Sequence, residues 1–294
     1  MFKGSIVALV TPFKNNVLDQ EKYVSLIQHH IVNGTKGVVP AGTTGESPTL
    51  NHDEHKKVIE IAVKECKGKI PVIAGTGSNS TAEAVELSRH AEKSGADGLL
   101  IVTPYYNKPI QEGLYQHYKL INDNVGIPII IYNIPPRSAI DMSVDTMARL
   151  FELKNIIGVK DATADLNRVD QQLKKMGPEF IQLSGEDGTA LEFNLRGGVG
   201  CISVTANVAP KLCSDFQEAS ISKNNSNILA KAKQINDKLM PLHKSLFIES
   251  SPSPVKYAAS LLNLSSDEVR LPLVKITDET KKAVKSAMTH ANLI

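Results

Sequence analysis

The stretch NIIGVKDAT (155–163) joins a short apolar run to a lysine, and runs of this kind recur along the whole chain. They lack the alternation of polar and apolar residues that marks a half-exposed sheet, so they are typical of buried parallel strands. Longer amphipathic segments separate them. Eight such runs are present: SIVALV (5–10), GVVPAG (37–42), PVIAGT (71–76), GLLIVTP (98–104), PIIIYN (128–133), IIGVK (156–160), FIQLSG (180–185) and GCISVT (200–205).

The alternation of these runs with helix-like segments predicts an α/β fold, a (β/α)8 TIM barrel. In the segment 80–95, Ser80 and Glu83 match a capping box and Gly95 a C-terminal stop. A doubly wound open sheet is the alternative that the same alternation permits. Its nucleotide fingerprint is incomplete, because GTGSNS (75–80) has a serine where the third glycine belongs.

The pattern changes after the eighth run to helix-like segments near 226–248, 253–262 and 278–291. We therefore expect a catalytic barrel in residues 1–224 and a C-terminal helical region in residues 225–294 that packs on it. The polar stretch SISKNNSN (220–227) predicts a solvated loop.

Composition narrows the possible partners. The 294 residues carry a formal net charge of +2 without a basic block, which gives no argument for a nucleic acid or an anionic membrane surface. No apolar stretch approaches the roughly 20 residues that span a bilayer. The three cysteines are widely spaced and contain no CxxC pair, so neither a disulfide framework nor a zinc site is indicated. We expect a cytoplasmic protein with a small-molecule partner.

The ends of the predicted strands carry reactive side chains, and in a TIM barrel these ends form the active-site face. Lys160 ends the sixth run. Burial there favours the neutral amine that attacks a carbonyl, which indicates a Schiff-base lysine. The alternative is a lysine at the edge of the core that pairs with an acid such as Asp161 or Asp187.

Hydroxyl groups at other strand ends suit the same chemistry. Thr43, Tyr106 and Tyr132 lie at the ends of three different predicted strands, where they could relay protons to and from a carbinolamine. Each alone is more often a packing residue. Arg137 follows two prolines, and a guanidinium on a stiff loop can clamp a carboxylate, although a surface ion pair is its commoner role. The loop AGTTGES (41–47) could bind a carboxylate through backbone N–H groups or be a plain tight turn.

The combination of motifs closely resembles the dihydrodipicolinate synthase family, among the class I pyruvate-dependent aldolases. The resemblance covers essentially the whole chain and rests on these motifs, in this order: GTTGES (42–47), VTPYYNKP (102–109), YNIPPR (132–137), IIGVKDAT (156–163), GCISVTAN (200–207), FIESSPSPVKYA (247–258) and RLPL (270–273).

The resemblance implies the reaction and its residues. Pyruvate condenses with L-aspartate 4-semialdehyde to give 4-hydroxy-tetrahydrodipicolinate, the committed step of diaminopimelate and lysine biosynthesis, without a metal or organic cofactor. Lys160 would form the Schiff base, and Thr43, Tyr132 and Tyr106 would shuttle protons. The implied substrate-binding residues are Thr44, Arg137, Gly185 and Ile202. Pro136 and Glu186 depart from the serine and aspartate that are common in the family.

The resemblance also implies partners. Tyr106 would reach across a tight dimer interface into the neighbouring site, the assembly would be a homotetramer built as a dimer of dimers, and an isolated monomer would be poorly active. A pyruvate-releasing sugar-acid lyase is the rival enzyme, and it would not need Arg137. A non-catalytic binding protein on an aldolase scaffold is the alternative from another class, but it would have no use for the hydroxyl relay.

Inhibition by L-lysine is a further expectation from the resemblance. Family members that bind L-lysine at the dimer interface do so with residues that match Ser47, His52, His55, Asn79, Glu83 and Tyr105. Without the family, the two histidines of NHDEH (51–55) would be read as a solvated helix face, and their spacing departs from the zincin pattern. Pro48, where alanine is usual, could alter the affinity.

Overall fold

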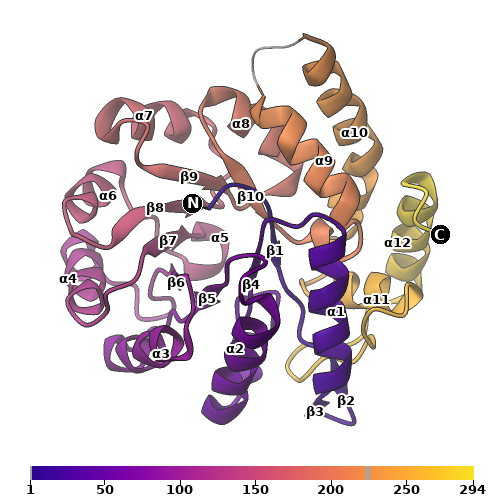
Figure 1. The fold of residues 1–294 in the computed structure, drawn as a ribbon, viewed down its shortest axis with the longest axis horizontal. Helices are drawn as coiled ribbons and strands as arrows, with labels where there is room; N and C mark the ends of the chain where they lie inside the picture. Colours follow the sequence, from indigo (N-terminus) through magenta and orange to yellow (C-terminus); the bar gives the residue numbers. More distant parts are fainter. Residues whose placement is uncertain (1, 223–225) are drawn as a thin grey trace.

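The computed structural model describes residues 2–222 and 226–294, and within them eight parallel strands form a barrel surrounded by helices (Figure 1). The barrel strands are β1 (Gly4–Ala8), β4 (Gly37–Val39), β5 (Ile73–Gly75), β6 (Gly98–Val102), β7 (Ile129–Asn133), β8 (Ile156–Asp161), β9 (Ile181–Ser184) and β10 (Gly200–Ser203). Each predicted apolar run contains or overlaps one of these strands. The predicted TIM barrel is therefore confirmed.

The strand order excludes the open sheet. The order is β4-β1-β10-β9-β8-β7-β6-β5, and a bridge between Val38 and Val72 joins its two ends. A backbone hydrogen bond from Gly75 N to Pro40 O, 3.0 Å long, adds to this closure. Gly75 permits the close approach, because a Cβ atom here would lie 2.4 Å from the carbonyl oxygen of Ala41.

Helices cover the outside of the barrel, and a further group follows at the C-terminus (Figure 1). The helices are α1 (Gln20–Val32), α2 (His52–Cys66), α3 (Thr81–Ser94), α4 (Gln111–Asn122), α5 (Pro135–Ser138), α6 (Val144–Phe151), α7 (Asn167–Met176), α8 (Ala190–Arg196), α9 (Pro210–Ile221), α10 (Ser226–Ser245), α11 (Ser253–Leu261) and α12 (Asp278–His290). Three short 3-10 helices are η1 (Ser47–Thr49), η2 (Asp187–Thr189) and η3 (Thr205–Asn207).

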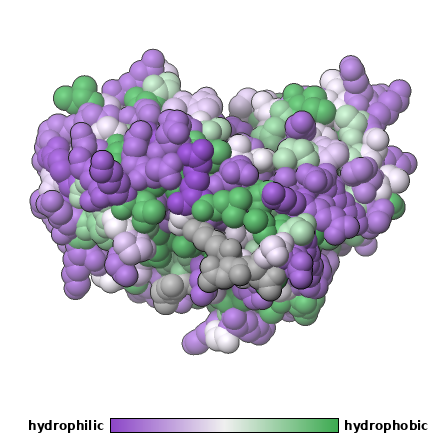
Figure 2. Space-filling view, turned by 90° about the horizontal axis from the view of Figure 1, so that it is seen from above, coloured by the Kyte–Doolittle hydropathy of each residue, from purple (hydrophilic) through white to green (hydrophobic). Residues whose placement is uncertain are grey.

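Two apolar layers hold the barrel together. Inside it, side chains such as Ile6, Leu100 and Ile130 form one core, which Phe2 joins near the N-terminus. Between the strands and the helices lies a second, larger core. Hydrophilic side chains cover most of the face shown in Figure 2, and hydrophobic ones form smaller groups between them, one of them near its middle. No described helix is long and apolar enough to cross a membrane.

Several details differ from the sequence predictions. Ser80 caps α3 by accepting a hydrogen bond from Glu83 N, but the Glu83 carboxylate turns to Ser78 and His52, so no reciprocal capping box forms. The predicted loop 220–227 is wrong at both ends, because Ser220 lies in α9 and Ser226 begins α10. Residues 223–225 of that loop, with the expected boundary at 225, lie outside the described residues. The hairpin of β2 (Phe13–Lys14) and β3 (Val17–Leu18) was not predicted.

Candidate active site

Lys160 and Tyr132 lie side by side at the C-terminal ends of two neighbouring strands. They are partners in the register of β7 and β8, so both point to the same side of the sheet. The Lys160 Nζ lies over the Tyr132 ring, 4.0 Å from its centroid. Lys160 is 5% exposed and Tyr132 is 6% exposed. The strand end therefore holds an amine against an aromatic ring and largely away from water.

Lys160 has no carboxylate partner among the described residues. Asp161 accepts hydrogen bonds from Thr163, Arg168 and Gln172 instead. Asp187 accepts from the backbone N–H groups of Val204 and Thr205, at 2.9 and 3.2 Å. The alternative interpretation, in which Lys160 pairs with Asp161 or Asp187, is therefore wrong.

The loop after β4 carries Thr43 and Thr44 on a sharply bent backbone. Ala41 and Glu46 both have positive φ angles, and a Cβ atom at Gly45 would lie 3.0 Å from the carbonyl oxygen of Leu9. The Thr11 hydroxyl donates to Gly45 O at 2.7 Å, which ties the loop to the segment after β1. These contacts give the loop a fixed shape at the edge of the barrel.

The Glu46 side chain anchors this loop to the C-terminal region of the chain. Its carboxylate, fully buried, accepts from Lys256 Nζ at 2.6 Å and from the backbone N–H of Arg270 at 3.0 Å. Lys256 also donates to Thr11 O at 2.9 Å and lies over the Phe13 ring. Burial lowers the pKa of Lys256, and the charge of Glu46 opposes that shift. The C-terminal helices are thereby tied to the loop that carries Thr43.

A cavity of about 430 Å³ opens at this end of the barrel. Thr43, Tyr132 and Arg137 line it, as do five of the residues expected to bind L-lysine: Ser47, His52, His55, Glu83 and Tyr105. The expected site residues that do not line it are Lys160, Thr44, Gly185, Ile202, Tyr106 and Asn79. One cavity thus joins part of the catalytic set to most of the L-lysine set.

Arg137 lies at the mouth of this cavity on the short helix α5. Pro135 occupies the first turn of the helix, as its fixed φ angle favours. The Arg137 side chain is exposed and donates from Nη2 to Ser251 O at 3.3 Å. A guanidinium without a carboxylate partner among the described residues remains available for an anionic ligand.

Tyr106 points away from its own cavity. It is 89% exposed, and its φ angle of 71° lies in the left-handed region that non-glycine residues seldom adopt. No hydrogen bond within the described residues joins its hydroxyl to Thr43 or Tyr132. The three expected relay hydroxyls are therefore not assembled by one chain.

Glu83 organises the residues expected to bind L-lysine. Its carboxylate accepts from the Ser78 hydroxyl and lies 2.8 Å from His52 Nε2. The bond from Ser78 is the main reason why the pKa of Glu83 is lowered. Burial lowers the pKa of His55 to about 4, although a hydrogen bond with the Gly75 backbone opposes this shift. The cavity therefore presents a carboxylate beside a neutral imidazole.

The remaining expected residues lie in the surrounding framework. Asn79 accepts through its backbone oxygen from Asn107 Nδ2 at 2.8 Å. Gly185 N donates to Asp161 O at 2.7 Å, and Ile202 packs inside the barrel. Burial raises the pKa of Glu186, and the charge of the adjacent Asp187 raises it further. The described residues contain no cluster of three or more side chains suited to a metal ion, and all three cysteines are free and buried.

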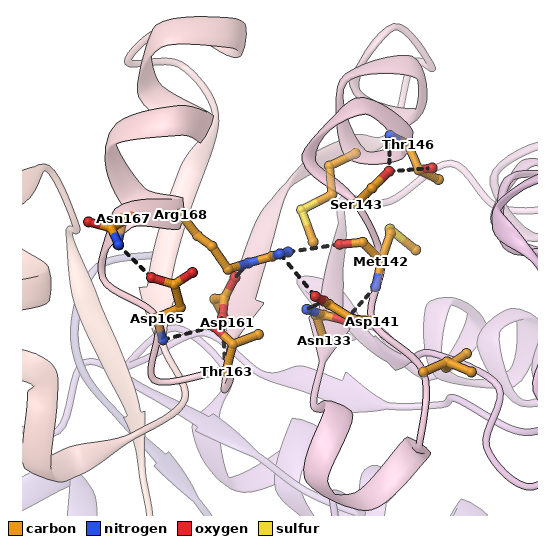
Figure 3. A network of polar contacts seen from close by, with 12 residues as sticks. Asn133, Asp141, Met142, Ser143, Thr146, Asp161, Thr163, Asp165, Asn167 and Arg168 are labelled. Carbon is orange, nitrogen blue, oxygen red and sulfur yellow. Dashed lines mark hydrogen bonds and ion pairs between the residues drawn. The ribbon is translucent and has the colours of Figure 1, made fainter.

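The sequence interpretation missed two wholly or partly buried ionic groups next to the site. One is the Lys256–Glu46 pair, and the other is formed by Arg168 with Asp161 and Asp141 (Figure 3). Lys256 and Glu46 are 210 positions apart, whereas Arg168 lies 27 positions from Asp141 and 7 from Asp161. The only local signals were an acid within AGTTGES and another directly after Lys160.

Comparisons with known proteins place this geometry in context. Residues 1–291 match the model of the dihydrodipicolinate synthetase family. Over its full length the chain is 71% identical to all of the 4-hydroxy-tetrahydrodipicolinate synthase of Pelagibacter ubique. It is also 63% identical over 293 residues to the enzyme of the same name from Bradyrhizobium diazoefficiens, with 98% of that protein covered.

The chain is also similar to solved structures of this family. The dihydrodipicolinate synthase of Acinetobacter baumannii, chloride-inhibited and complexed with pyruvate, is 44% identical, with a TM-score of 0.96 and full coverage of both chains. The enzyme of Cyanidioschyzon merolae with lysine bound is 36% identical, with a TM-score of 0.95 and 100% and 99% of the two chains covered.

Proposed function

The chain belongs to the dihydrodipicolinate synthetase family, and on that premise we propose that it acts through a Schiff base between pyruvate and Lys160. The chain is a lyase that catalyses the pyruvate-dependent condensation step of diaminopimelate and lysine biosynthesis, which yields 4-hydroxy-tetrahydrodipicolinate. We propose L-aspartate 4-semialdehyde as the second substrate. The observation that carries the assignment of Lys160 is its position, buried at a strand end without an acid partner and stacked on Tyr132.

The chemistry follows from a free amine at this position. The Lys160 amine adds to the keto carbon of pyruvate, and loss of water gives an iminium ion. Loss of a methyl proton then gives an enamine, whose carbon attacks the aldehyde and forms the new carbon–carbon bond. Finally the amino group of the second substrate adds to the iminium carbon and displaces Lys160, which closes the ring. The iminium nitrogen is the electron sink throughout, so the proposed steps need no metal or organic cofactor.

Proton transfer in these steps is assigned to Thr43, Tyr132 and Tyr106. Thr43 and Tyr132 line one cavity, whereas Tyr106 projects into solvent from its own chain. This outward position supports a tight dimer in which each Tyr106 completes the relay of the neighbouring chain. Two such dimers would form the homotetramer.

Backbone and guanidinium groups are assigned to the substrate carboxylates. Thr44 and the neighbouring backbone would bind pyruvate, with Gly185 and Ile202 forming the wall behind it. Arg137 would bind the carboxylate of the semialdehyde, because its exposed guanidinium lies at the cavity mouth. This requirement also separates the reaction from that of a sugar-acid lyase.

We assign the L-lysine site to Ser47, His52, His55, Asn79, Glu83 and Tyr105. The Glu83 carboxylate supplies the negative charge that a ligand amine requires, and five of the six residues share the cavity with Thr43 and Tyr132. The relative with lysine bound supports lysine as a ligand of this chain as well. Glu83→Gln should weaken inhibition by L-lysine at least about tenfold while turnover without L-lysine is retained. Equal activity with and without saturating L-lysine in the unaltered enzyme would disprove the site.

The enzyme is assigned to the cytoplasm, where amino acids are synthesised. Its three free, buried cysteines suit a reducing compartment.

The deciding experiment is condensation of pyruvate with L-aspartate 4-semialdehyde, coupled to the reductase that consumes the product. We expect turnover, and we expect borohydride to trap pyruvate on Lys160, identified by peptide mass spectrometry. Trapping without turnover would keep the aldolase class and indicate another aldehyde. Absence of both would favour a binding protein on an aldolase scaffold.

A further inference from the structure

We propose that Arg168 is a positioning residue that fixes Lys160 relative to Tyr132 from the outer side of the barrel (Figure 3). The inference rests on the proposed function, because it takes Lys160 and Tyr132 as the reacting pair. Arg168 itself lies on α7, outside the barrel wall, and it does not line the cavity. It would act through the residues that follow the two catalytic side chains.

The guanidinium of Arg168 makes three contacts with two segments. Its Nε donates to Asp161 Oδ2 at 2.9 Å, and its Nη1 contacts Asp141 Oδ2 at 3.2 Å. Its Nη2 donates to the carbonyl oxygen of Met142 at 2.8 Å. The planar guanidinium thus joins the end of β8 to the loop that follows α5, as Figure 3 shows.

Each joined segment leads directly to a catalytic residue. Asp161 follows Lys160, and Asn133 follows Tyr132 in the paired strand. Asn133 donates to Asp141 Oδ1 at 2.7 Å and accepts from Met142 N at 3.0 Å. Side chains alternate along a strand, so Asp161 and Asn133 point outward where Lys160 and Tyr132 point inward. Arg168 therefore binds, on the outside of the barrel, the residues that come directly after the paired Lys160 and Tyr132.

The same contacts close the loop that carries Arg137. The chain leaves β7 at Asn133, passes Arg137 on α5 and returns at Asp141, where the Asn133 amide and the Arg168 guanidinium both bind it. The base of the loop is thus fixed to the strand that presents Tyr132. Displacement of Arg168 should therefore disturb both the Schiff-base lysine and the proposed carboxylate clamp.

The position of Arg168 in the first turn of α7 is unfavourable for a positively charged side chain. It is the second residue of α7, where the helix dipole disfavours a positive charge, and its side chain is only 10% exposed. A residue that breaks a local rule is often explained by a requirement at a functional site. Here the two carboxylates and the carbonyl provide that explanation. A displacement of about 1 Å in such a framework can reduce turnover by up to about a hundredfold.

The test uses the full-length enzyme with the substitution R168K. Lysine keeps the charge but cannot bind both carboxylates and the carbonyl in one plane. The matched control is R196K on α8, where Arg196 forms a half-exposed ion pair with Asp170 at 2.8 Å. Borohydride trapping with labelled pyruvate counts the competent sites in each preparation, and turnover is then expressed per trapped site.

We expect R168K to lower kcat per trapped site about tenfold or more while KM for pyruvate changes less than about threefold. R196K should behave like the unaltered enzyme. A purely structural role would lower the melting temperature and the number of competent sites but leave kcat per site unchanged, and that result would overturn the proposal. An equal loss in R196K would also overturn it.

A second variant tests the proposal in case R168K folds poorly. Asp141 is half-exposed, and D141N removes the ion pair with Arg168 while it keeps an acceptor for Asn133. A fall in kcat per trapped site of about threefold or more would support the proposal, and unchanged turnover would overturn it. Failure of the unaltered enzyme to trap pyruvate would instead contradict the proposed function, so the two failures are distinguishable.

Discussion

Lys160 and Lys256 are both buried, with 5% and 0% of their surface exposed, but only Lys256 has a carboxylate partner. Lys256 donates to Glu46 at 2.6 Å and to Thr11 O at 2.9 Å, so two of its three N–H donors are paired. Lys160 contacts the ring of Tyr132, and no ion pair involves it within residues 2–222 and 226–294. Both lysines face an aromatic ring. The structural lysine and the proposed reactive lysine therefore differ in the acid partner, not in burial alone.

The substitution K160R should have the largest effect. It keeps a positively charged side chain of similar length but removes the proposed Schiff-base nucleophile. We expect turnover to fall by at least about a thousandfold and borohydride trapping to disappear, with little change in melting temperature. The measurements are the coupled assay and mass spectrometry. Turnover close to that of the unaltered enzyme would show that Lys160 is not the reactive lysine and does not differ in role from Lys256.

The substitution K256M should act on stability. It leaves the Glu46 carboxylate buried without its ammonium partner, which costs about 3–5 kcal/mol of unfolding free energy. The double variant K256M/E46Q should recover part of this loss, because no unpaired charge remains. Urea unfolding of the two single variants and the double variant measures the coupling. Losses that simply add would show that the two side chains are not coupled.

The two lysines can also be compared with buried histidines, whose hydrogen-bond partners are neutral hydroxyl groups. Burial lowers the pKa of His117 to about 4 and that of His30 to about 3, and each ring is bonded to a threonine hydroxyl. Unfolded histidine binds a proton near pH 6.5, where the folded protein excludes it. The stabilisation is therefore complete above about pH 6.5 and decreases as the pH falls toward 4, by up to about 1.4 kcal/mol per pH unit for each histidine.

The pH dependence can be measured by urea unfolding between pH 7 and pH 4. His117→Gln should reduce the slope by about one proton, whereas H290Q, at an exposed position ending α12, should leave it unchanged. Equal slopes for H117Q and the unaltered enzyme would contradict the assignment.

An exposed lysine should show the smallest effect. Lys275 forms an ion pair with Asp267 at 2.7 Å, but its side chain is 62% exposed. Water and salt screen such pairs, so K275A should change the unfolding free energy by about 0.5 kcal/mol or less. A loss comparable with that of K256M would show that burial is not what separates these ion pairs.

The fold could be predicted from the sequence because its signal is local. Each barrel strand is a short apolar run, and the helix 80–95 has both of its ends marked by Ser80 and Gly95. Lys160 stood out for the same reason, as a charge that ends an apolar run. The two-residue strands of the β2–β3 hairpin are too short to give such a pattern.

The polar contacts behind the site could not be predicted in this way. Neither Arg168 nor Lys256 was singled out in the sequence, because the burial and pairing of a charged side chain depend on tertiary contacts; the carboxylate partner of Lys256 lies 210 positions away. The Glu83 side chain shows the same limit. Its position three residues after Ser80 predicted a capping box, but tertiary contacts with Ser78 and His52 took its carboxylate.

The closure of the barrel has a consequence for its local motions. Five register pairs join β7 to β8, whereas Val38 and Val72 form the one bridge across the described seam between β4 and β5. Local opening costs least where few contacts must break. Amide hydrogen exchange should therefore be faster at Val38 and Gly75 than at Tyr132 and Lys160. Thr11 and Glu46 hold the Thr43 loop beyond this seam, so the opening should stay confined to the seam while the strands that carry the lysine and its aromatic neighbour stay closed.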